Sequence, residues 1–295
     1  MPQARIVTSN ADRRAALAVG HAATRADQPF EHYAALRFRV PFRRVGEWWL
    51  LEDDDGTPVT SLMCYPLRLA TPGEAPIDGY GIGAVATHPD HRARGHASRL
   101  CEAACEHAEG AGRRVGLLYS AIPPALYERL GFQVAPAYGW RCEALDAFDD
   151  EAAAAFAPVD GIREVEMLAP LYEAWHPGLH SYRDAEGFRY SCVRSPDDVF
   201  FVLGEPARSY VRLYLDESDE VEITELIVQP EDEAGALAFV FALARRHGRP
   251  AVPGWMPPTP RIEALFEPTS RAKTLPMVRG YESLDGSMFW SSDYF

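Results

Sequence analysis

A short turn with two arginines and a glycine offers the clearest chemistry in the sequence. Arg92, Arg94, Gly95 and Ala97 have the spacing R-x-x-G-x-A, which is neither the G-x-G-x-x-G pattern of dinucleotide-binding loops nor a Walker loop. The small residues allow a ligand to approach the backbone, and the guanidinium groups add positive charge. A helix that begins here would add unpaired N–H groups and the positive end of its dipole. We therefore expect the turn to bind a di-anion, with a pyrophosphate as the leading candidate.

The segments on either side of this turn predict a strand before it and a helix after it. Residues 79–87 are small and apolar, as in a buried strand. After the turn, apolar residues recur at helical spacing until Gly110 and Gly112 end the pattern. This stripe comprises Ala97, Leu100, Cys101, Ala104, Cys105 and Ala108. A second strand at 115–119 and a shorter helix at 123–130 follow.

Two motifs in this region resemble the acetyl-CoA-binding core of the GNAT superfamily of N-acetyltransferases. The first is the run from Val85 to Leu100, and the second is the later L-Y-E-R-L-G-F segment, Leu126 to Phe132. In that family the Q/R-x-x-G-x-G/A turn holds the pyrophosphate of coenzyme A, and the preceding strand contacts the pantetheine arm through its backbone. The resemblance implies that the following residues bind the coenzyme: Val85, Ala86, Thr87, Arg92, Ala93, Arg94, Gly95, His96, Ala97, Ser98 and Ser120.

The same resemblance implies a catalytic role for Tyr127. When an amine attacks the thioester it expels a thiolate, and a nearby acid must supply a proton to the sulfur. A phenol at the start of the short helix can do this, and the alternative is a packed tyrosine whose hydroxyl satisfies a buried group. The segment 120–124 departs from the family, which often has Asn at its start, although Ser120 can still cap a helix.

The second half of the sequence repeats the order of elements of the first half. The first half is predicted to contain strand 5–8, helices 11–24 and 30–39, hairpin 47–51 with 59–69, the central motif, and a closing hairpin of 134–136 with 138–143. The second half is predicted to contain strand 161–166, helix 167–175, hairpin 198–203 with 210–215, strand 221–228, helices 233–247 and 261–266, and a closing segment 274–281. We therefore predict an α+β fold with mixed sheets, built from two tandem GNAT-like domains at residues 1–148 and 149–295.

The repeat lacks the chemistry of the first copy. Glu231, Asp232 and Glu233 stand where the first copy has Arg92 and Arg94, and carboxylates there would repel a pyrophosphate. The second domain is therefore expected to be degenerate and architectural. Tandem GNAT domains of which only the first is active resemble the enhanced intracellular survival family, although this sequence is too short for that family's third domain.

The general base has several candidates. An ammonium group must lose its proton before it attacks, and Asp78 and Glu47 are candidates by their position near the expected cleft. The sequence ends in an aromatic segment, Trp290 to Phe295, and the resemblance to the survival family implies that the terminal carboxylate of Phe295 is a catalytic base. The alternative is a tail that packs on the second domain.

Composition limits the class of partner and the location. The net charge of -14 argues against nucleic acid and permits a cationic acceptor. The sequence has no run of about 18 apolar residues that would predict a membrane span. Its N-terminus lacks the apolar centre of a signal peptide, so a cytoplasmic protein is expected. The five cysteines form no C-x-x-C pair, and a homo-oligomer is compatible with the sequence.

Two further groups of residues could bind a metal ion or an amine. His88, His91 and His96 crowd the arginine turn without a cysteine or carboxylate at ligand spacing, so no metal site is predicted. Several aromatic residues flank the expected acceptor cleft and could contact an amine through cation–π interactions, although core packing is the alternative for most of them. These residues are Trp48, Trp49, Tyr65, Phe38 and Phe42.

These patterns together predict an acetyl-CoA-dependent N-acetyltransferase that moves the acetyl group directly to an amine of a small, cationic acceptor. Backbone N–H groups near Val85 would polarise the thioester carbonyl, and Tyr127 would protonate the departing sulfur. The alternative from another class is a non-catalytic coenzyme-A-binding protein with a regulatory or interaction role.

Overall fold

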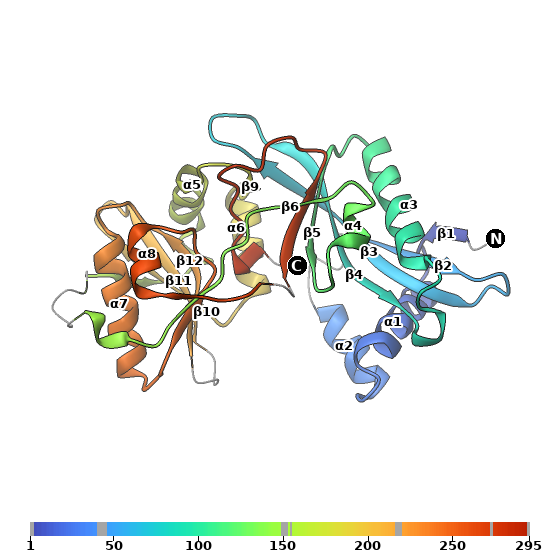
Figure 1. Cartoon of the computed structure of the whole chain (residues 1–295), viewed down its shortest axis with the longest axis horizontal. Coiled ribbons are helices and arrows are strands. Elements are labelled where there is room, and N and C mark those ends of the chain that lie inside the picture. Colours follow the sequence, from blue (N-terminus) through green and yellow to red (C-terminus); the bar gives the residue numbers. More distant parts are fainter. Residues whose placement is uncertain are drawn as a thin grey trace.

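The protein consists of two lobes that lie side by side, each with a mixed sheet and helices packed on it (Figure 1). The computed structural model describes residues 3–39, 46–148, 153, 155–215, 220–271 and 274–293. Within these ranges, no helix is both long and apolar enough to cross a bilayer.

The first lobe follows the predicted order of elements closely. It contains β1 (Gln3–Ile6), α1 (Asn10–Thr24), α2 (Phe30–Arg39), β2 (Glu47–Glu52), β3 (Pro58–Ala70), β4 (Ile77–Thr87), α3 (His96–Gly110), β5 (Val115–Ser120), α4 (Ala125–Glu128) and β6 (Gln133–Val134). Local chemistry sets the boundaries. The Ser9 side chain accepts a hydrogen bond from Asp12 N at the start of α1. In the β2–β3 turn, Asp53 Oδ1 accepts from Asp55 N and Thr57 N.

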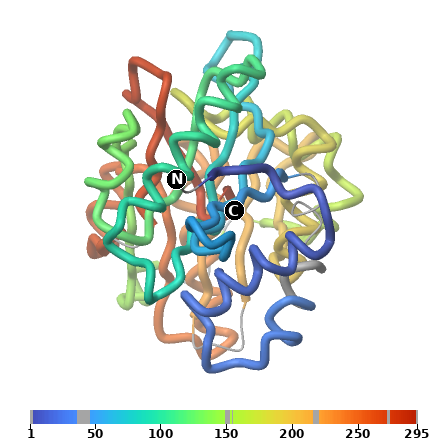
Figure 2. Tube along the Cα trace, turned by 90° about the vertical axis from the view of Figure 1, so that its right-hand side faces the viewer, coloured from blue at the N-terminus to red at the C-terminus, as the bar shows by residue number. Residues whose placement is uncertain are grey.

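The helices of this lobe cover opposite faces of its sheet. The apolar stripe of α3 packs on one face, where Leu100, Cys101 and Ala104 are buried against Ile82 and Leu118. Helices α1 and α2 cover the other face, and Figure 2 shows them in blue, well apart from the teal α3. Trp48, Trp49 and Tyr65 are buried in these cores, as their alternative interpretation predicted. Phe42 and the Phe38 side chain lie outside the described residues.

The second lobe has a similar order of elements with several differences from the prediction. The chain after β6 contains β7 (Trp140–Cys142), β8 (Ala157–Val159), α5 (Val165–Trp175), β9 (His180–Ser181), α6 (Ala185–Arg194), β10 (Asp198–Leu203), β11 (Ser209–Leu215), β12 (Val221–Ile227), α7 (Glu233–Arg246), β13 (Val252–Gly254), α8 (Pro260–Leu265), β14 (Glu267–Pro268) and β15 (Leu275–Arg279). Of these strands, β9 and β15 pair in the sheet of the first lobe. The predicted strand at 161–166 is wrong, because Val165 already begins α5 and buries its side chain in the core. Helix α6 and strand β13 were not predicted.

The two lobes exchange strands. β15 pairs with β5 and β6 in the first sheet, and it appears as the red arrow to the left of β5 in Figure 1. β7 pairs with β13 and β14 in the second sheet. The predicted closing hairpin of 134–136 with 138–143 is therefore wrong, and segment 274–281 closes the first sheet rather than the second. Burial explains the exchange, because Met277 joins the core under α3 whereas Trp140 joins the core of the second lobe.

The predicted division of the chain at residues 148 and 149 stays a prediction. The first sheet contains β9 and β15 from after that point, with β9 paired to the end of β3, and the second sheet contains β7 from before it.

Candidate active site

A gap between β4 and β5 forms the centre of the site. The two strands are parallel neighbours only where Gly79–Ile82 face Val115–Leu118. Beyond Ile82, a bulge shifts the β3–β4 register, and Ala84 adopts a left-handed φ of 52°. The strands separate there and leave a cavity of about 580 Å³, which we call the strand-gap cavity. It is lined by β4 from Ile82 to Thr87, by Tyr119 at the end of β5 and by Tyr127 of α4.

The arginine turn lies at one end of this cavity. Ala93 and Gly95 both have left-handed φ values, 61° and 77°, which fold the chain tightly into the start of α3. The first hydrogen bond of α3 runs from Arg99 N to Gly95 O, so the N–H groups before Arg99 lie at the open end of the helix. The turn therefore has the backbone arrangement that favours an anion.

The two arginines of the turn keep their charge available. Arg92 donates from Nη2 to Ala23 O at 3.1 Å, and Arg94 donates from Nη2 to Asp90 O at 3.0 Å. Within the described residues, neither guanidinium forms an ion pair with a carboxylate. The neighbouring His96 is buried, and burial, followed by the charge of Arg99, lowers the pKa of His96. His96 is therefore neutral near pH 7, and the arginines supply the positive charge.

Tyr127 also lines the strand-gap cavity. Its side chain is 7% exposed, and its ring meets Phe132 edge-on with centroids 6.3 Å apart. Hydrogen bonds from Leu130 N and Phe132 N to Tyr127 O hold the turn that follows α4. Burial, with a smaller effect of Cys101, raises the pKa of Tyr127 well above its usual value. The phenol therefore keeps its proton and can act as an acid rather than a base.

The predicted coenzyme-binding residues fall into three places. Those that line the strand-gap cavity are Val85, Ala86, Thr87, Arg92 and Ala97. Those that build the adjoining turn and helix start are Ala93, Arg94, Gly95, His96 and Ser98. Ser120 is buried beneath the cavity, where its Oγ donates to Ile122 O at 2.6 Å. Ala121 and Ile122 line the cavity at this point instead.

The candidates for the general base are not gathered around Tyr127. Asp78 is exposed and lies 3.9 Å from Arg68, at the opposite end of β4. Glu47 lies on β2, where its Oε2 is 3.8 Å from His107 Nε2. Neither is among the described residues that line the strand-gap cavity. Phe295 lies outside the described residues, so its predicted role stays a prediction.

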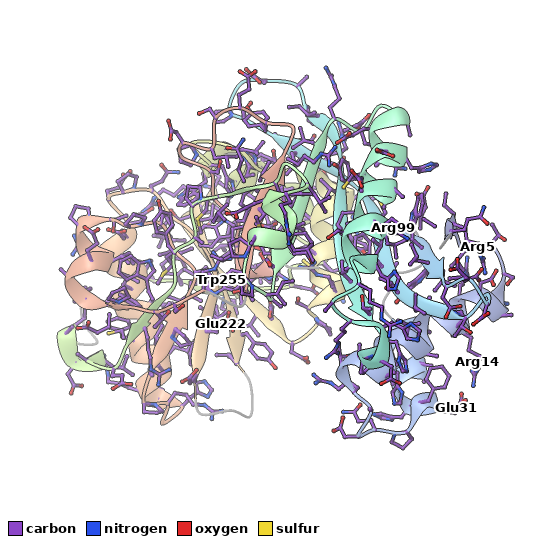
Figure 3. All side chains as sticks on the ribbon, turned by 45° about the vertical axis from the view of Figure 1, so that its right-hand side comes forward. Arg5, Arg14, Glu31, Arg99, Glu222 and Trp255 are labelled. Atoms are coloured by element: carbon purple, nitrogen blue, oxygen red, sulfur yellow. The ribbon has the colours of Figure 1, made fainter. Side chains whose placement is uncertain are left out.

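Residues of the second lobe hold one wall of the cavity, and the sequence analysis missed them. The Tyr119 ring stacks on Trp255 with centroids 6.5 Å apart, and Trp255 lies near the middle of the molecule in Figure 3. The Arg271 guanidinium lies 3.4 Å from the centroid of the Trp255 ring. Burial raises the pKa of Tyr119 well above its usual value, so its hydroxyl also stays protonated. These contacts join distant parts of the chain, and no local motif signals them.

The second lobe has a corresponding gap without the arginine turn. Six residues separate Pro89 from His96 in the first lobe, whereas two separate Pro230 from Glu233. In the shortened turn, Asp232 accepts hydrogen bonds from Arg208 and Ser209. The Trp175 indole also donates to Val228 O at 2.9 Å, which occupies a backbone acceptor at the end of β12. The Asp232 carboxylate in the turn and the Val228 carbonyl at the strand end are thus both bound by other groups of the protein.

The three histidines near the arginine turn are close together but do not form a cluster with other ligands. The ring centroids of His88 and His91 are 5.8 Å apart, and those of His91 and His96 are 6.4 Å apart. In the part of the chain that the structure describes, no group of three or more His, Cys, Asp or Glu residues is arranged to hold a metal ion.

Comparison with known proteins places this geometry in a family. Residues 18–135 match the family model of an acetyltransferase (GNAT) domain. A search of the curated proteins found no match. The part of the chain that builds the strand-gap cavity therefore matches a GNAT acetyltransferase domain, and domains of this family transfer an acyl group from acetyl-CoA as co-substrate.

Solved structures identify the arrangement of the two lobes. The chain is similar to a GCN5-related N-acetyltransferase from Kribbella flavida, at 18% identity and a TM-score of 0.70, over 94% of this chain and 71% of that one. It is similar to Eis1 from Mycobacterium abscessus, at 19% identity and a TM-score of 0.63, over 95% and 73%. It is also similar to a tandem GNAT protein from the clavulanic acid biosynthesis pathway, at 18% identity and a TM-score of 0.54, over 96% and 100%. The fold is therefore a tandem GNAT fold of the Eis type.

Replacement of Gly95 tests the anion site. We expect Gly95→Val to weaken coenzyme A binding by about tenfold or more, because a β-branched residue distorts the left-handed turn that presents the helix start. Gly112 has a similar φ of 86° at the far end of α3, so Gly112→Val introduces the same strain away from the turn. Calorimetric titration with coenzyme A should show the loss only in the first variant. Equal affinities of the two variants would contradict the assignment.

Proposed function

We propose that this protein transfers the acetyl group of acetyl-CoA directly to an amine of a small acceptor. One observation carries the proposal: the cavity between β4 and β5 is lined both by a cationic turn at a helix start and by a protonated, buried tyrosine. A coenzyme whose pyrophosphate lies at the turn can extend its thioester arm along β4 toward Tyr127. This geometry suits a reaction in which two bound substrates react without a covalent enzyme intermediate.

The reaction divides between the backbone and Tyr127. Backbone N–H groups of β4 near Val85 would polarise the thioester carbonyl, and the bulge at Ala84 leaves this segment without the partner strand that pairs with Gly79–Ile82. The amine nitrogen bonds to the carbonyl carbon, the carbon–sulfur bond breaks, and Tyr127 donates its proton to the sulfur. The proton lost by the attacking ammonium goes to a general base, for which Phe295 stays a predicted candidate, whereas Asp78 and Glu47 do not line the strand-gap cavity.

The second lobe is proposed to be a non-binding scaffold. Its short turn, the pairing of Asp232 with Arg208 and the hydrogen bond of Trp175 to Val228 all oppose coenzyme binding there. Its contribution would be to hold Tyr119 in place through the stacking of Trp255 on its ring. The cytoplasmic location and a homo-oligomeric state stay predictions.

A thiol-release assay with acetyl-CoA and a panel of amines tests the proposal. We expect stoichiometric release of coenzyme A with formation of an acetylated amine. A single stoichiometric binding event with acetyl-CoA, without acyl transfer to any amine, would instead support the non-catalytic coenzyme-binding alternative.

A further inference from the structure

The inner end of the strand-gap cavity is the point where β4 and β5 begin to pair. The pair of residues nearest to the gap is Ile82 with Leu118, and Tyr119 is the first residue of β5 beyond it. Both Ile82 and Tyr119 line the cavity. Leu118 is buried in the core under α3, so alternation turns the Tyr119 side chain to the opposite face of the sheet. Tyr119 therefore stands at the inner end of the cavity, on the side of the second lobe.

A coenzyme bound as proposed above would point its acyl group at this inner end. The arginine turn adjoins the outer end of β4, because Arg92 Nε lies 3.4 Å from Thr87 O. From Thr87 to Ile82 the strand spans about 17 Å, at about 3.3 Å per residue. The arm of coenzyme A has about 13 bonds between its phosphorus and its sulfur and spans about 16 Å when fully extended. The sulfur therefore reaches the inner part of the cavity, and an acyl group on it extends toward Tyr119.

The residues along the path of the arm are small, whereas the residue at its end is large. Gly83, Ala84 and Ala86 line the cavity on β4, and Ala97 and Ala121 line it on other elements. These side chains leave room for the arm to pass. The room available to the acyl group is therefore set at the inner end, by the position of the Tyr119 ring.

The Tyr119 ring is held by a closed loop of contacts. It stacks on Trp255 at an interplanar angle of 28°, and the Trp255 ring carries the buried Arg271 guanidinium 3.4 Å from its centroid. Arg271 Nη2 donates to Thr274 O at 3.1 Å, and Thr274 N donates to Arg271 O at 2.8 Å. Thr274 directly precedes β15, on which Pro276 pairs with Tyr119 itself. A displacement of the Tyr119 ring toward the second lobe therefore requires Trp255 to move as well.

Trp255 occupies in the second lobe the position that Tyr119 occupies in the first. Ile223 of β12 pairs in parallel with Gly254 of β13, and Trp255 follows Gly254 directly. The corresponding gap of the second lobe is lined by Met256, and Trp255 is not among its described lining residues. The Trp255 ring instead stacks on Tyr119 across the boundary between the lobes. The second lobe thus directs its own strand-gap aromatic residue to the wall of the first cavity.

We propose that Tyr119, held by Trp255 and Arg271, closes the inner end of the strand-gap cavity and limits the acyl donor to a group of about the size of acetyl. This inference rests on the proposed acetyl transfer and adds to it the selection of the acyl group. Tyr119 contacts the acyl group, whereas Trp255 and Arg271 are positioning residues that act through Tyr119. A longer acyl chain meets the ring and shifts the thioester away from Tyr127.

Two acyl donors of different length test the inference. Acetyl-CoA and butyryl-CoA differ by two methylene groups, and calorimetric titration without an acceptor measures their affinities in the absence of turnover. We expect butyryl-CoA to bind the wild type at least about tenfold more weakly than acetyl-CoA, because its chain overfills the closed end of the cavity. Tyr119→Ala should reduce this difference to about twofold or less, because it opens the inner end.

Variants of Trp255 test positioning without a change to the cavity wall itself. Trp255→Leu leaves Tyr119 without its stacking partner and should reduce the difference between the donors by about threefold or more, whereas Trp255→Phe keeps an aromatic ring and should preserve it. Phe239→Leu is the control, because it removes a half-buried ring of the second lobe whose described ring contacts are Phe156 and Phe201. General loosening of the second lobe would affect both donors alike, so the ratio of the two affinities reports positioning.

The outcomes separate this inference from the proposed function. Equal affinities of the wild type for the two donors, or an unchanged ratio in a Tyr119→Ala variant that still binds acetyl-CoA, would overturn the inference. If Tyr119→Ala no longer binds acetyl-CoA, Trp255→Leu decides, and a wild-type ratio in that variant would contradict the role of Tyr119. A difference between the donors without acyl transfer to any amine would count against the proposed function while it supports the closed inner end.

Discussion

Replacement of Tyr127 by Phe is expected to lower kcat by about a hundredfold or more while acetyl-CoA affinity stays nearly unchanged. The substitution removes the phenol and keeps the ring that packs against Phe132. Without a positioned proton donor, the departing thiolate must be protonated by water. The rate constant for a single turnover, measured by mixing the acetyl-CoA complex with the acceptor, reports this step directly.

The control for this prediction is Tyr138→Phe. Tyr138 packs against the core of the second lobe and lies outside the strand-gap cavity, so this change should leave kcat unaltered. A high pH should also not restore the activity of Tyr127→Phe, because protonation of the sulfur becomes harder as protons become scarce. An activity of Tyr127→Phe within threefold of the wild type would show that the tyrosine only packs, and water would then be the proton donor.

Replacement of Arg212 by Met is expected to destabilise the protein by about 3–5 kcal/mol, because it breaks a buried ion-pair network. Arg212 is fully buried, with Nη1 2.9 Å from Glu225 Oε1 and Nε 2.6 Å from Asp198 Oδ2. Arg183 shares Glu225 at 2.7 Å, and Tyr210 donates to its other oxygen at 2.5 Å. Burial alone would raise the pKa of Glu225, but Arg183 and Arg212 together lower it to about 2. This carboxylate therefore stabilises the fold above pH 4.5, and the contribution is lost only as the pH falls toward 2.

Thermal unfolding should show the loss as a decrease in Tm of about 10 °C. Arg14→Met is the control, because the pair of Arg14 with Glu31 is exposed at the outer edge of the first lobe (Figure 3). That change should cost less than about 1 kcal/mol. The double variant Arg212→Met with Asp198→Asn should recover part of the stability, because it removes the carboxylate whose ion pair was with Arg212, whereas Glu225 keeps its pair with Arg183. Equal shifts for the buried and the exposed arginine would contradict this account.

The predictable part of the site is the part encoded by neighbouring residues. A strand, a turn with two arginines and a helix follow one another between residues 79 and 110, and each has a local signal in the sequence. The structure contains these elements, with α3 beginning at His96 and its predicted stripe buried except for the half-buried Ala97. The position of Tyr127 at the cavity was expected from the resemblance of residues 126–132 to a family motif, and α4, which carries it, begins only a few residues after β5.

The unpredictable part depends on contacts between distant residues. Arg183, Arg212 and Glu225 are charged, so a hydrophobic pattern assigns them to the surface, and only the fold shows that they neutralise one another inside the core. Helix α6, which carries Arg194, has alternating polar and apolar residues without strong cap signals apart from Asp184. The sheet that a strand joins is equally hard to predict, because the local sequences of β7 and β15 are compatible with either sheet. Trp140 of β7 is buried in the second lobe and Met277 of β15 in the first, and hydrophobic periodicity does not indicate this.

The exchange of β7 and β15 has a consequence for how this molecule is made. A ribosome releases β15 long after β5, so the first sheet stays incomplete until most of the second lobe has been synthesised. Neither half, expressed alone, would contain the strands that complete its own sheet. We therefore expect that the half with the strand-gap cavity cannot be excised by itself, because its sheet is completed by a strand from the other half.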